Sequence, residues 1–516
     1  MGDHKHNEKK EKVDYYSKTG IGKKGIKKWY FPILGFLALI WFIIRVIPRP
    51  SRIRYPCQRR FAAPMAIGFL SWLGGITGIY TSISKIRYYF KKGRISYSGI
   101  LVIFLLFFSG IALLYTNSSA DISPNNPVGK GKGIYPGRVI WSHNPEATSW
   151  NGYDNYWWDD ENTDITEVKG MFSQSLLKLT GRKDLNGAWE AIFTYYNENN
   201  NGIEKNYEKG EKIAIKLNLN THSYYSEESN EIDLSPQVVE VLVESLVEKG
   251  KVREQDIILY DASRIMGDKI YKRIYAKYPE IIFVDNQGEE GRKKVEPDEN
   301  AKIYFPEQDF NYYYLPKRIA EAKYLINLAS MKKHSLAGVT FTAKNHFGSI
   351  YDVSSGIWTP RKLHQGVNTR NNKNGNPNPL INLMGHQDLG GKTVLYIIDS
   401  LYSAMNQQDN NPVRWSMKPF SGDWTSSLFM SQDGVALDSV AFDFLNEETN
   451  IPENSNNYLK EAAMADNPPS DIEYDPENND NNLSSLGVYE HWNNPDDKKY
   501  SGNLGKNEGI ELIKID

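Results

Sequence analysis

The sequence predicts an α/β domain, with a mainly parallel sheet flanked by helices, and an all-α transmembrane anchor that precedes it. Two patterns predict this organisation. Over residues 141–516, short apolar runs of strand length alternate with segments of helical periodicity. Over residues 29–120, long uncharged apolar stretches instead lie between clusters of Lys and Arg.

The charge is divided between these two parts of the chain. Residues 1–120 hold 20 Lys and Arg against 4 Asp and Glu, and the remaining residues hold 41 against 59. An acidic domain lacks the concentrated cationic face that phosphate contacts need, so we expect no nucleic-acid partner. The single cysteine, Cys57, excludes an internal disulfide, a four-cysteine zinc site and a protein-held iron–sulfur cluster.

Three apolar stretches predict a membrane anchor in the lipid bilayer. A basic tail over residues 1–28 precedes them, and they are Trp29–Ile47, Phe61–Ser84 and Ile95–Ala120. Three spans with a cytoplasmic N-terminus place 14 Lys and Arg inside and 8 outside, as the positive-inside rule requires. Two spans give 11 on each side and decide nothing. We therefore expect a multi-pass protein whose C-terminal domain lies outside the cytoplasm; buried helices of a soluble domain are the alternative.

A Gly-, Pro- and Asn-rich linker over residues 121–140 leads into the α/β domain. The expected strands are Lys212–Leu219, Asp256–Asp261, Ile281–Asp285, Tyr324–Leu328, Val394–Asp399 and Leu428–Ser431. The expected helices are Pro236–Lys249 with Ser235 as N-cap, Lys269–Lys277, Leu336–Phe347 and Val435–Asn446. The segments Asn371–Pro379 and Asp466–Asn482 have the composition of long surface loops.

Polar side chains follow most of these predicted strands. They are Asn218, Asn220, Asp261, Asp285, Lys332, Lys333, His334, Asp399 and Asp433. In an open parallel sheet, ligands bind outside the carboxyl ends of the strands. If the strands are parallel, these residues therefore converge on one rim. The alternative is ordinary turn chemistry, because Asn and Asp favour strand ends.

The segment 331–350, MKKHSLAGVTFTAKNHFGSI, is the most informative in the chain. A strand leads into Lys332 and His334, and the expected helix carries Lys344 and Asn345. Backbone N–H groups at a helix start, together with lysines, favour an anionic group such as a carboxylate or phosphate. A lysine partly buried on this apolar helix would have a shifted pKa or a partner, whereas a solvated lysine is the alternative.

Two charged residues lie in apolar surroundings. Asp438 lies inside the run QDGVALDSVAFDFL, where Asp433 has the position of an N-cap. Lys216 lies inside the strand IAIKLNL. A buried charge needs an opposite charge or hydrogen-bond partners. A Lys216–Asp438 pair is one hypothesis, and a metal-bound Asp438 is another.

The segment 141–164 combines aromatic and acidic residues. Its candidate metal ligands are His143, Asp159 and Asp160, and several Trp and Tyr residues lie between them. Such mixtures suit sugar stacking or a divalent cation held by oxygen and nitrogen ligands. The alternative is an aromatic loop packed on the domain with its acids in solvent.

Three sequence blocks carry a family resemblance. The run HSLAGVTFTAKNHFG resembles the signature of the domain-of-unknown-function family 362, a widespread bacterial group, and AIKLNLN and QDGVALDSVAFDFL are similar to its other blocks. The runs IRYPCQRRFAAP, GIYPGRVIWSHNPEAT and SLGVYEHWNNPDDKKYSGNLG are similar to its membrane-anchored Bacteroidetes-type members. The resemblance implies an α/β domain and little about chemistry. Together with the predicted topology, it leads us to expect that a bacterial inner-membrane anchor holds this domain in the periplasm. Some relatives carry ferredoxin-like cysteine clusters, which this chain lacks.

Two functions of different classes remain open. In the first, the rim binds a polar or anionic ligand through Lys216, Asn218, Asn220, Asn345, Asp399, Asp433 and Asp438. If that rim is catalytic, His334 is the general base or metal ligand, Lys332 and Lys344 stabilise negative charge, and a divalent metal assists. In the second, a non-catalytic cell-envelope protein binds a glycan or a protein partner through its Trp-, Tyr- and Asn-rich surface.

Cysteines introduced at Ser17 and Asn479 in a Cys57→Ser background test the predicted topology. Three spans place the tail inside and the domain outside, so a membrane-impermeant maleimide should label position 479 and not position 17 in intact cells. Permeabilised cells, in which both positions should react, are the control. Labelling of position 17 alone would reverse the topology.

Overall fold

A computed structural model of the chain describes residues 124–516, except residues 221–223, 227, 306–311, 359–360, 408 and 410. The chain divides into two compact units, Met1–Asp121 and Ile122–Asp516, and all of the described residues belong to the second. The predicted tail and anchor lie outside the described residues. Among the helices of the described part, none is long and apolar enough to cross a membrane.

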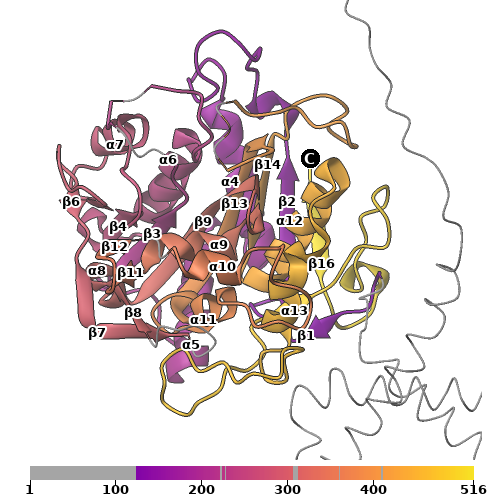
Figure 1. The fold of residues 1–516 in the computed structure, drawn as a ribbon. Coiled ribbons are helices and arrows are strands. Elements are labelled where there is room, and N and C mark those ends of the chain that lie inside the picture. The colour runs from indigo at the N-terminus through magenta and orange to yellow at the C-terminus, as the bar shows by residue number, and fades with distance from the viewer. Residues whose placement is uncertain are drawn as a thin grey trace, which may run out of the picture. The chain divides into compact units, whose positions relative to one another are not determined.

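A ten-stranded mixed sheet forms the centre of the domain (Figure 1). Its strands, in sheet order, are β16 (Glu511–Ile515), β2 (Arg138–His143), β14 (Ser427–Ser431), β13 (Thr393–Ala404), β9 (Tyr324–His334), β3 (Ile213–Leu217), β4 (Ile257–Tyr260), β5 (Ile282–Asp285) and β6 (Lys293–Lys294), with β10 (Gly338–Thr340) paired to β9 alone. Neighbours along this order are parallel, except that β14 is antiparallel to both β2 and β13. The hairpin β9–β10 is antiparallel as well.

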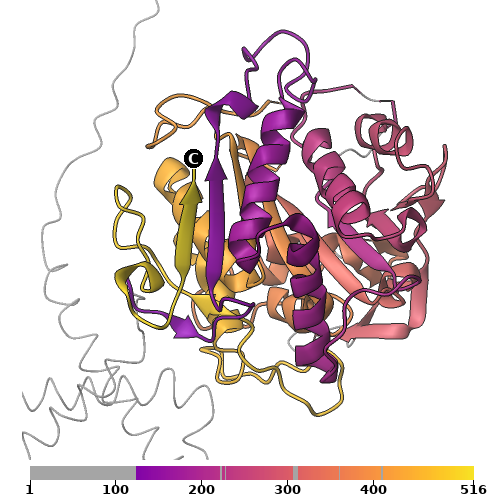
Figure 2. The ribbon, with the colours of Figure 1, turned by 180° about the vertical axis from the view of Figure 1, so that it is seen from behind.

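Four helices cover one face of this sheet, the face seen in Figure 2. They are α4 (Ile165–Thr180), α5 (Leu185–Asn201), α6 (Pro236–Glu244), which continues as a π-helical turn over Ser245–Lys249, and α7 (Asp268–Tyr275). Their apolar residues form one core with the alternate residues of the central strands, such as Ile215 and Leu217. Burial on both faces explains why the central strands consist of nearly continuous apolar runs.

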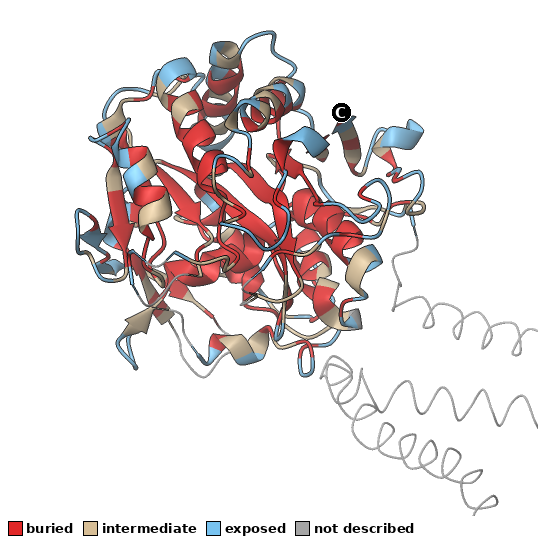
Figure 3. Ribbon diagram, turned by 90° about the horizontal axis from the view of Figure 1, so that it is seen from above, coloured by how far each residue is buried: buried red, intermediate tan, exposed pale blue. Residues whose placement is uncertain are grey.

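The other face packs against shorter elements and one long helix. They are α9 (Thr342–Asn345), α11 (Leu380–Gly385), α12 (Gly434–Thr449) and α13 (Asn457–Ala463). A four-stranded sheet also lies here, in the order β12 (Ile357–Trp358), β11 (Tyr351–Asp352), β8 (Tyr312–Pro316) and β7 (Pro297–Tyr304). The remaining short elements are β1 (Val128–Gly129), paired with β15 (Val488–Tyr489), α8 (Lys317–Ala320) and α10 (Leu363–Gly366). Figure 3 shows buried residues concentrated in the large sheet and in the helix surfaces that face it.

The structure confirms the α/β class and all six predicted strands, of which β9 and β13 are longer than expected. The helices predicted near α6, α7 and α12 are also present. The two predicted loop segments, 371–379 and 466–482, contain no helix or strand.

The helix predicted over Leu336–Phe347 is wrong. The chain there turns back as β10, pairs with the end of β9, and begins the short helix α9 only at Thr342. Gly338 has φ +82°, in the left-handed region, and a Cβ at this position would lie 1.9 Å from Ser455 Oγ. Glycine is therefore required here for the hairpin and for the close approach of Ser455.

The rim prediction holds for five of the six strands. Strands β3, β4, β5, β9 and β13 run in the same direction, so their carboxyl ends share one edge of the sheet. Strand β14 runs the other way, with Ser431 opposite Tyr396. Asp433 therefore lies at the opposite edge, and its predicted place on the rim is wrong.

Candidate functional site

The candidate site lies at the carboxyl ends of β9, β3 and β4, which are neighbours in the sheet. Lys332 is at the end of β9, Asn218 follows β3, and Asp261 follows β4. The segment that contains α9 packs against β9 and brings Lys344 and Asn345 to the same place. The structure thus brings together most of the predicted rim residues.

Lys216 forms a buried ion pair with Asp261. Its side chain is 1% exposed, and its Nζ lies 3.0 Å from Asp261 Oδ2. The same Nζ donates to the carbonyl oxygen of Leu217 at 2.6 Å and to Asn345 Oδ1 at 3.1 Å. Burial lowers the pKa of Lys216, and the charge of Asp261 opposes that shift. The hypothesis of a Lys216–Asp438 pair is therefore wrong.

The side-chain amide of Asn345 links three segments. Its Oδ1 accepts hydrogen bonds from Lys216 Nζ and from Asn218 Nδ2, the latter at 3.2 Å. Its Nδ2 donates to Asn327 Oδ1 at 2.8 Å and to the carbonyl oxygen of Leu328 at 3.1 Å. Asn345 thus fixes α9 to both β3 and β9.

Asp438, on α12, holds the first turn of α9. Its Oδ1 accepts from Thr342 N at 3.0 Å and from Thr342 Oγ1 at 2.6 Å. Its Oδ2 accepts from Ala343 N at 3.1 Å and from Tyr458 Oη at 3.0 Å. Burial raises the pKa of Asp438 to about 6. Because this carboxylate occupies N–H groups at the helix start, the predicted anion site on the helix N-terminus is wrong.

Lys344 is buried without a counterion. Its Nζ lies 3.7 Å from the centre of the Phe347 ring, and the residue is 9% exposed. Among the described residues, no carboxylate pairs with Nζ and no oxygen accepts a hydrogen bond from it. Burial and the nearby charges of Arg264 and Lys216 lower the pKa of Lys344 to about 7. The predicted shifted lysine is therefore present.

Further polar groups beside Lys344 have unused hydrogen-bonding capacity. Arg264 donates through NH1 to the carbonyl oxygen of Ser263 at 3.1 Å, while its buried Nε has no partner within the described residues. The same is true of the buried Oδ1 of Asn218. Lys332 Nζ donates to the carbonyl oxygen of Ile232 at 3.2 Å, and burial lowers the pKa of Lys332 to about 8.

His334 lies at the same edge, in the β9–β10 hairpin. Its Nδ1 accepts hydrogen bonds from Leu336 N at 3.1 Å and Ala337 N at 3.2 Å. In the neutral ring the proton is then on Nε2. Burial and the charges of Lys344 and its neighbours hold the pKa of His334 well below its usual range. This geometry supports a neutral hydrogen-bond donor rather than the general base expected from the sequence.

Three other predicted ligand residues support the backbone. Asp399 accepts from Ser235 N at 2.7 Å and Leu401 N at 3.1 Å, which holds the start of α6. Asn220 Nδ2 donates at 2.6 Å to the carbonyl oxygens of Ile232 and Gln407, which joins two loops beside the rim. Asp433 N-caps α12, as expected, by accepting from Ala436 N at 2.9 Å.

The three predicted metal ligands have separate partners. His143 Nδ1 lies 3.2 Å from the carbonyl oxygen of Thr425, Asp159 accepts from Tyr156 N at 3.0 Å, and Asp160 pairs with Arg273 at 2.8 Å. In residues 124–516, leaving aside the undescribed gaps, no group of three or more His, Cys, Asp or Glu residues could hold a metal ion. Trp150 and Trp157 of the same segment are buried in the core.

The sequence analysis did not single out Arg264 or Asn327. Arg264 follows β4 by a few residues in the run DASRIMG, so it belongs to the same class of strand-end residues as Asp261. Asn327 is a polar residue inside the apolar strand YLINLAS. A buried amide in such a strand needs hydrogen-bond partners, and that is the signal that could have identified it.

Residues 213–443 match the model of the family described as a domain of unknown function, DUF362. The match begins with β3 and ends in α12, so it contains Lys216, Lys344 and Asp438. It confirms the domain resemblance over these residues. The likeness to membrane-anchored members stays a prediction. No curated protein matches the chain.

The buried Lys216–Asp261 pair predicts a large and non-additive loss of stability. Lys216→Met leaves a buried carboxylate without its cation, which should lower the free energy of unfolding by roughly 3–5 kcal/mol. The double variant Lys216→Met/Asp261→Asn removes both charges and should lose less than the sum of the two single losses. Urea unfolding of the full chain, followed by tryptophan fluorescence, measures these differences.

Lys212→Met is the matched control. Lys212 Nζ pairs with Asp256 Oδ1 at 2.8 Å and joins the same two strands at their other ends, but its side chain is 35% exposed. Asp256 also keeps Arg253, so this variant should lose less than about 1 kcal/mol. Equal losses for Lys212→Met and Lys216→Met would contradict a special role for the buried pair.

Proposed function

We propose that the domain binds a ligand with a carboxylate or phosphate group at the edge of the sheet where Lys344, Lys332 and Arg264 gather. The observation that carries this proposal is the buried Lys344 side chain, for whose ammonium group no described residue supplies a counterion. Asn218, Arg264 and His334 are half-buried, so the group of donors reaches the surface at this edge.

Two buried lysines of the domain, Lys216 and Lys344, differ in whether a described residue supplies a counterion. Lys216 and Lys344 are both buried, and both have a pKa lowered by burial. Lys216 has Asp261 at 3.0 Å, as a buried charge ordinarily does, whereas among the described residues Lys344 contacts the Phe347 ring and no carboxylate. An unpaired buried cation lowers stability, so its presence favours a bound anion over a purely structural role.

A bound anion would accept hydrogen bonds from several donors at once. Arg264 offers its free Nε–H, His334 offers Nε2–H, and Lys332 retains unused protons on Nζ. Hydrogen bonds from an arginine or lysine cation to an anionic oxygen are among the strongest in proteins. These residues together make a site for a small anionic group rather than for an extended polymer.

The same site could perform acid–base chemistry. A lysine with a pKa of about 7 exchanges its proton at neutral pH, which suits a general acid or base. Lys344 therefore takes the proton-transfer role that the sequence analysis gave to His334, if the bound molecule reacts. Participation of a divalent metal stays a prediction, and elemental analysis of the purified protein tests it.

The predicted anchor belongs to the same proposal. Its excess of Lys and Arg in the tail and in the loop before the third apolar stretch supports a domain held outside the cytoplasm of a bacterial cell. In that compartment, the ligand would be an anionic molecule of the cell envelope or its surroundings.

One observation favours the second candidate function, glycan binding without catalysis. One face of the four-stranded sheet carries a row of half-buried aromatic residues, of which Trp358 packs in part against the core; they are Tyr304, Tyr312, Tyr314, Tyr351 and Trp358. They share a face because they occupy directly opposed or alternate positions. Aromatic rings on a flat sheet can stack on sugar rings.

Lys344→Met tests the anion site with sulfate, which keeps its charge across the pH range used. Sulfate should raise the midpoint of thermal unfolding of the wild-type chain more at pH 6 than at pH 8.5, because Lys344 is protonated only below a pKa of about 7. Chloride at equal ionic strength is the salt control. In Lys344→Met the sulfate affinity should fall about tenfold or more, since one charge-assisted hydrogen bond is lost.

The control variant is Lys317→Met. Lys317 is an exposed lysine on α8, just before the opposite end of β9, so its removal changes the net charge equally but leaves the site intact. Without sulfate, Lys344→Met should be at least as stable as the wild type at pH 6, and that advantage should shrink as the pH rises above 7 and folded Lys344 becomes neutral. Equal sulfate responses in the wild type and in Lys344→Met would refute the site.

A further inference from the structure

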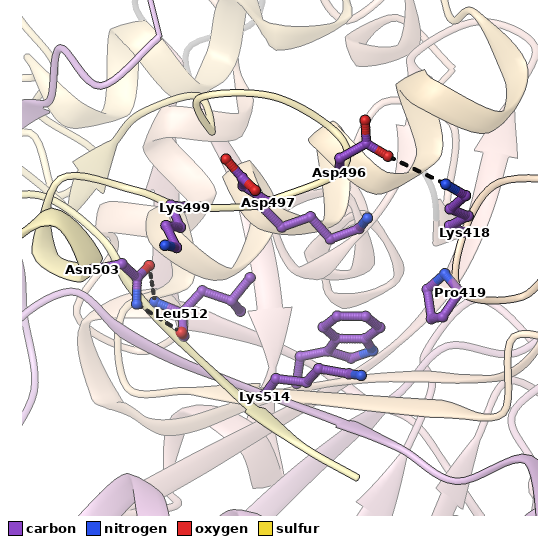
Figure 4. A pocket seen from close by; sticks show the side chains of 10 residues that line it. Lys418, Pro419, Asp496, Asp497, Lys499, Asn503, Leu512 and Lys514 are labelled. Carbon is purple, nitrogen blue, oxygen red and sulfur yellow. Dashed lines mark hydrogen bonds and ion pairs between the residues drawn. The ribbon is translucent and has the colours of Figure 1, made fainter.

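A second polar pocket lies beside β16, the strand at one edge of the large sheet, and its neighbour β2 (Figure 4). It has a volume of about 390 Å³. Its lining consists of Trp141, Lys418, Pro419, Asp496, Asp497, Lys498, Lys499, Asn503, Leu512 and Lys514. Strands β14 and β13 separate β2 from β9 in the sheet, so this pocket is distinct from the site at Lys344.

The pocket has cations on opposite sides. Figure 4 shows Lys418 and Asp496 on one side, with Lys514 and Leu512 across from them. Lys499 and Asn503 lie at one end, and Pro419 lies at the other. A ligand inside would therefore meet ammonium groups from two directions.

Positive charge dominates the lining, with four lysines against two aspartates. Asp496 lies 3.8 Å from Lys418 Nζ, but both side chains are more than 80% exposed, so this pair is weak. Lys514 pairs with Asp516 at the end of the chain, where both side chains are again exposed. No carboxylate in the described part of the chain forms an ion pair with Lys499.

Lys498 is the most deeply placed of these lysines. It is 9% exposed, and its Nζ donates to the carbonyl oxygen of Pro495. The ring of Trp492 lies 5.5 Å from the same Nζ. Burial lowers the pKa of Lys498, so an anion in the pocket would offset part of that cost.

The pocket also has a rigid apolar wall. Trp141 is 2% exposed, stacks on Phe429 with ring centres 6.1 Å apart, and donates from its indole N–H to Ser427 Oγ at 3.0 Å. Lys514 Nζ lies 5.3 Å from the Trp141 ring centre. With Pro419 and Leu512, Trp141 gives the pocket its apolar lining.

We propose that this pocket binds a small organic dianion whose apolar body packs against Trp141, Leu512 and Pro419 while its two anionic groups face the lysines on either side. A volume of about 390 Å³ suits a small molecule rather than a macromolecular segment. The arrangement of cations on opposite sides selects two separated negative charges over one. Nothing in this proposal depends on the site at Lys344.

Calorimetric titration of the full chain with benzene-1,3-dicarboxylate tests the pocket. The wild type should bind this dianion, and the neutral diamide of the same shape should not bind. The double variant Lys499→Met/Lys514→Met should bind the dianion about tenfold or more weakly, because it removes two charge-assisted contacts. Lys514→Arg should retain binding, since it keeps the charge.

Two further variants locate the binding. Lys178→Met removes an exposed lysine from α4, on the other face of the sheet, and Lys317→Met removes an exposed lysine from α8. Both should bind the dianion as the wild type does. Absence of binding to the wild type, equal binding to Lys499→Met/Lys514→Met, or an equal loss in Lys178→Met or Lys317→Met would each overturn the assignment.

Discussion

The side-chain amide of Asn345 is the constraint on which the site depends. It accepts from Lys216 and Asn218 on one side and donates to Asn327 and Leu328 on the other, so both of its ends are used. Because an amide alone combines acceptor and donors at this size, neither Asp nor Leu could make the same bonds. This link fixes α9 against β3 and β9, and it thereby sets the position of Lys344, the preceding residue.

Two buried lysines near this amide have different chemical surroundings. The domain supplies Asp261 and Asn345 Oδ1 to Lys216, which makes that ammonium group part of the framework. It supplies Lys344 with an aromatic ring and two like charges instead. Burial and like charges destabilise the protonated form of such a lysine. The folded protein therefore gains stability when an anion binds beside it or when the lysine loses its proton. Binding and acid–base chemistry thus both follow from a buried lysine that has no counterion among the residues that the structure describes.

Local patterns predicted the strands and their shared edge because a buried parallel strand is an apolar run that ends in polar residues. They could not predict long-range partners. Lys216 pairs with Asp261, and Asp438 instead supports α9, which only tertiary structure decides. The reversed direction of β14 moved Asp433 to the other edge, and the connection from β13 to β14, which has no helix in its described residues, is the signal that could have indicated that direction.

The same limit explains the false helix over Leu336–Phe347. The apolar spacing there suits a helix, but Gly338 has a positive φ and the hairpin pairs with β9, so tertiary contacts override the local preference. Helices α4 and α5 were missed although Asp164 and Asp184 cap them, and those caps followed by apolar spacing are the signal that could have found them.

The most direct test of the account is the pKa of Lys344, measured by NMR on the full chain with ¹³C-labelled lysine and assigned with the Lys344→Arg variant. The account predicts titration near pH 7 without ligand and an upward shift on adding sulfate. Titration above pH 10 in both conditions, as for a solvated lysine, would contradict it.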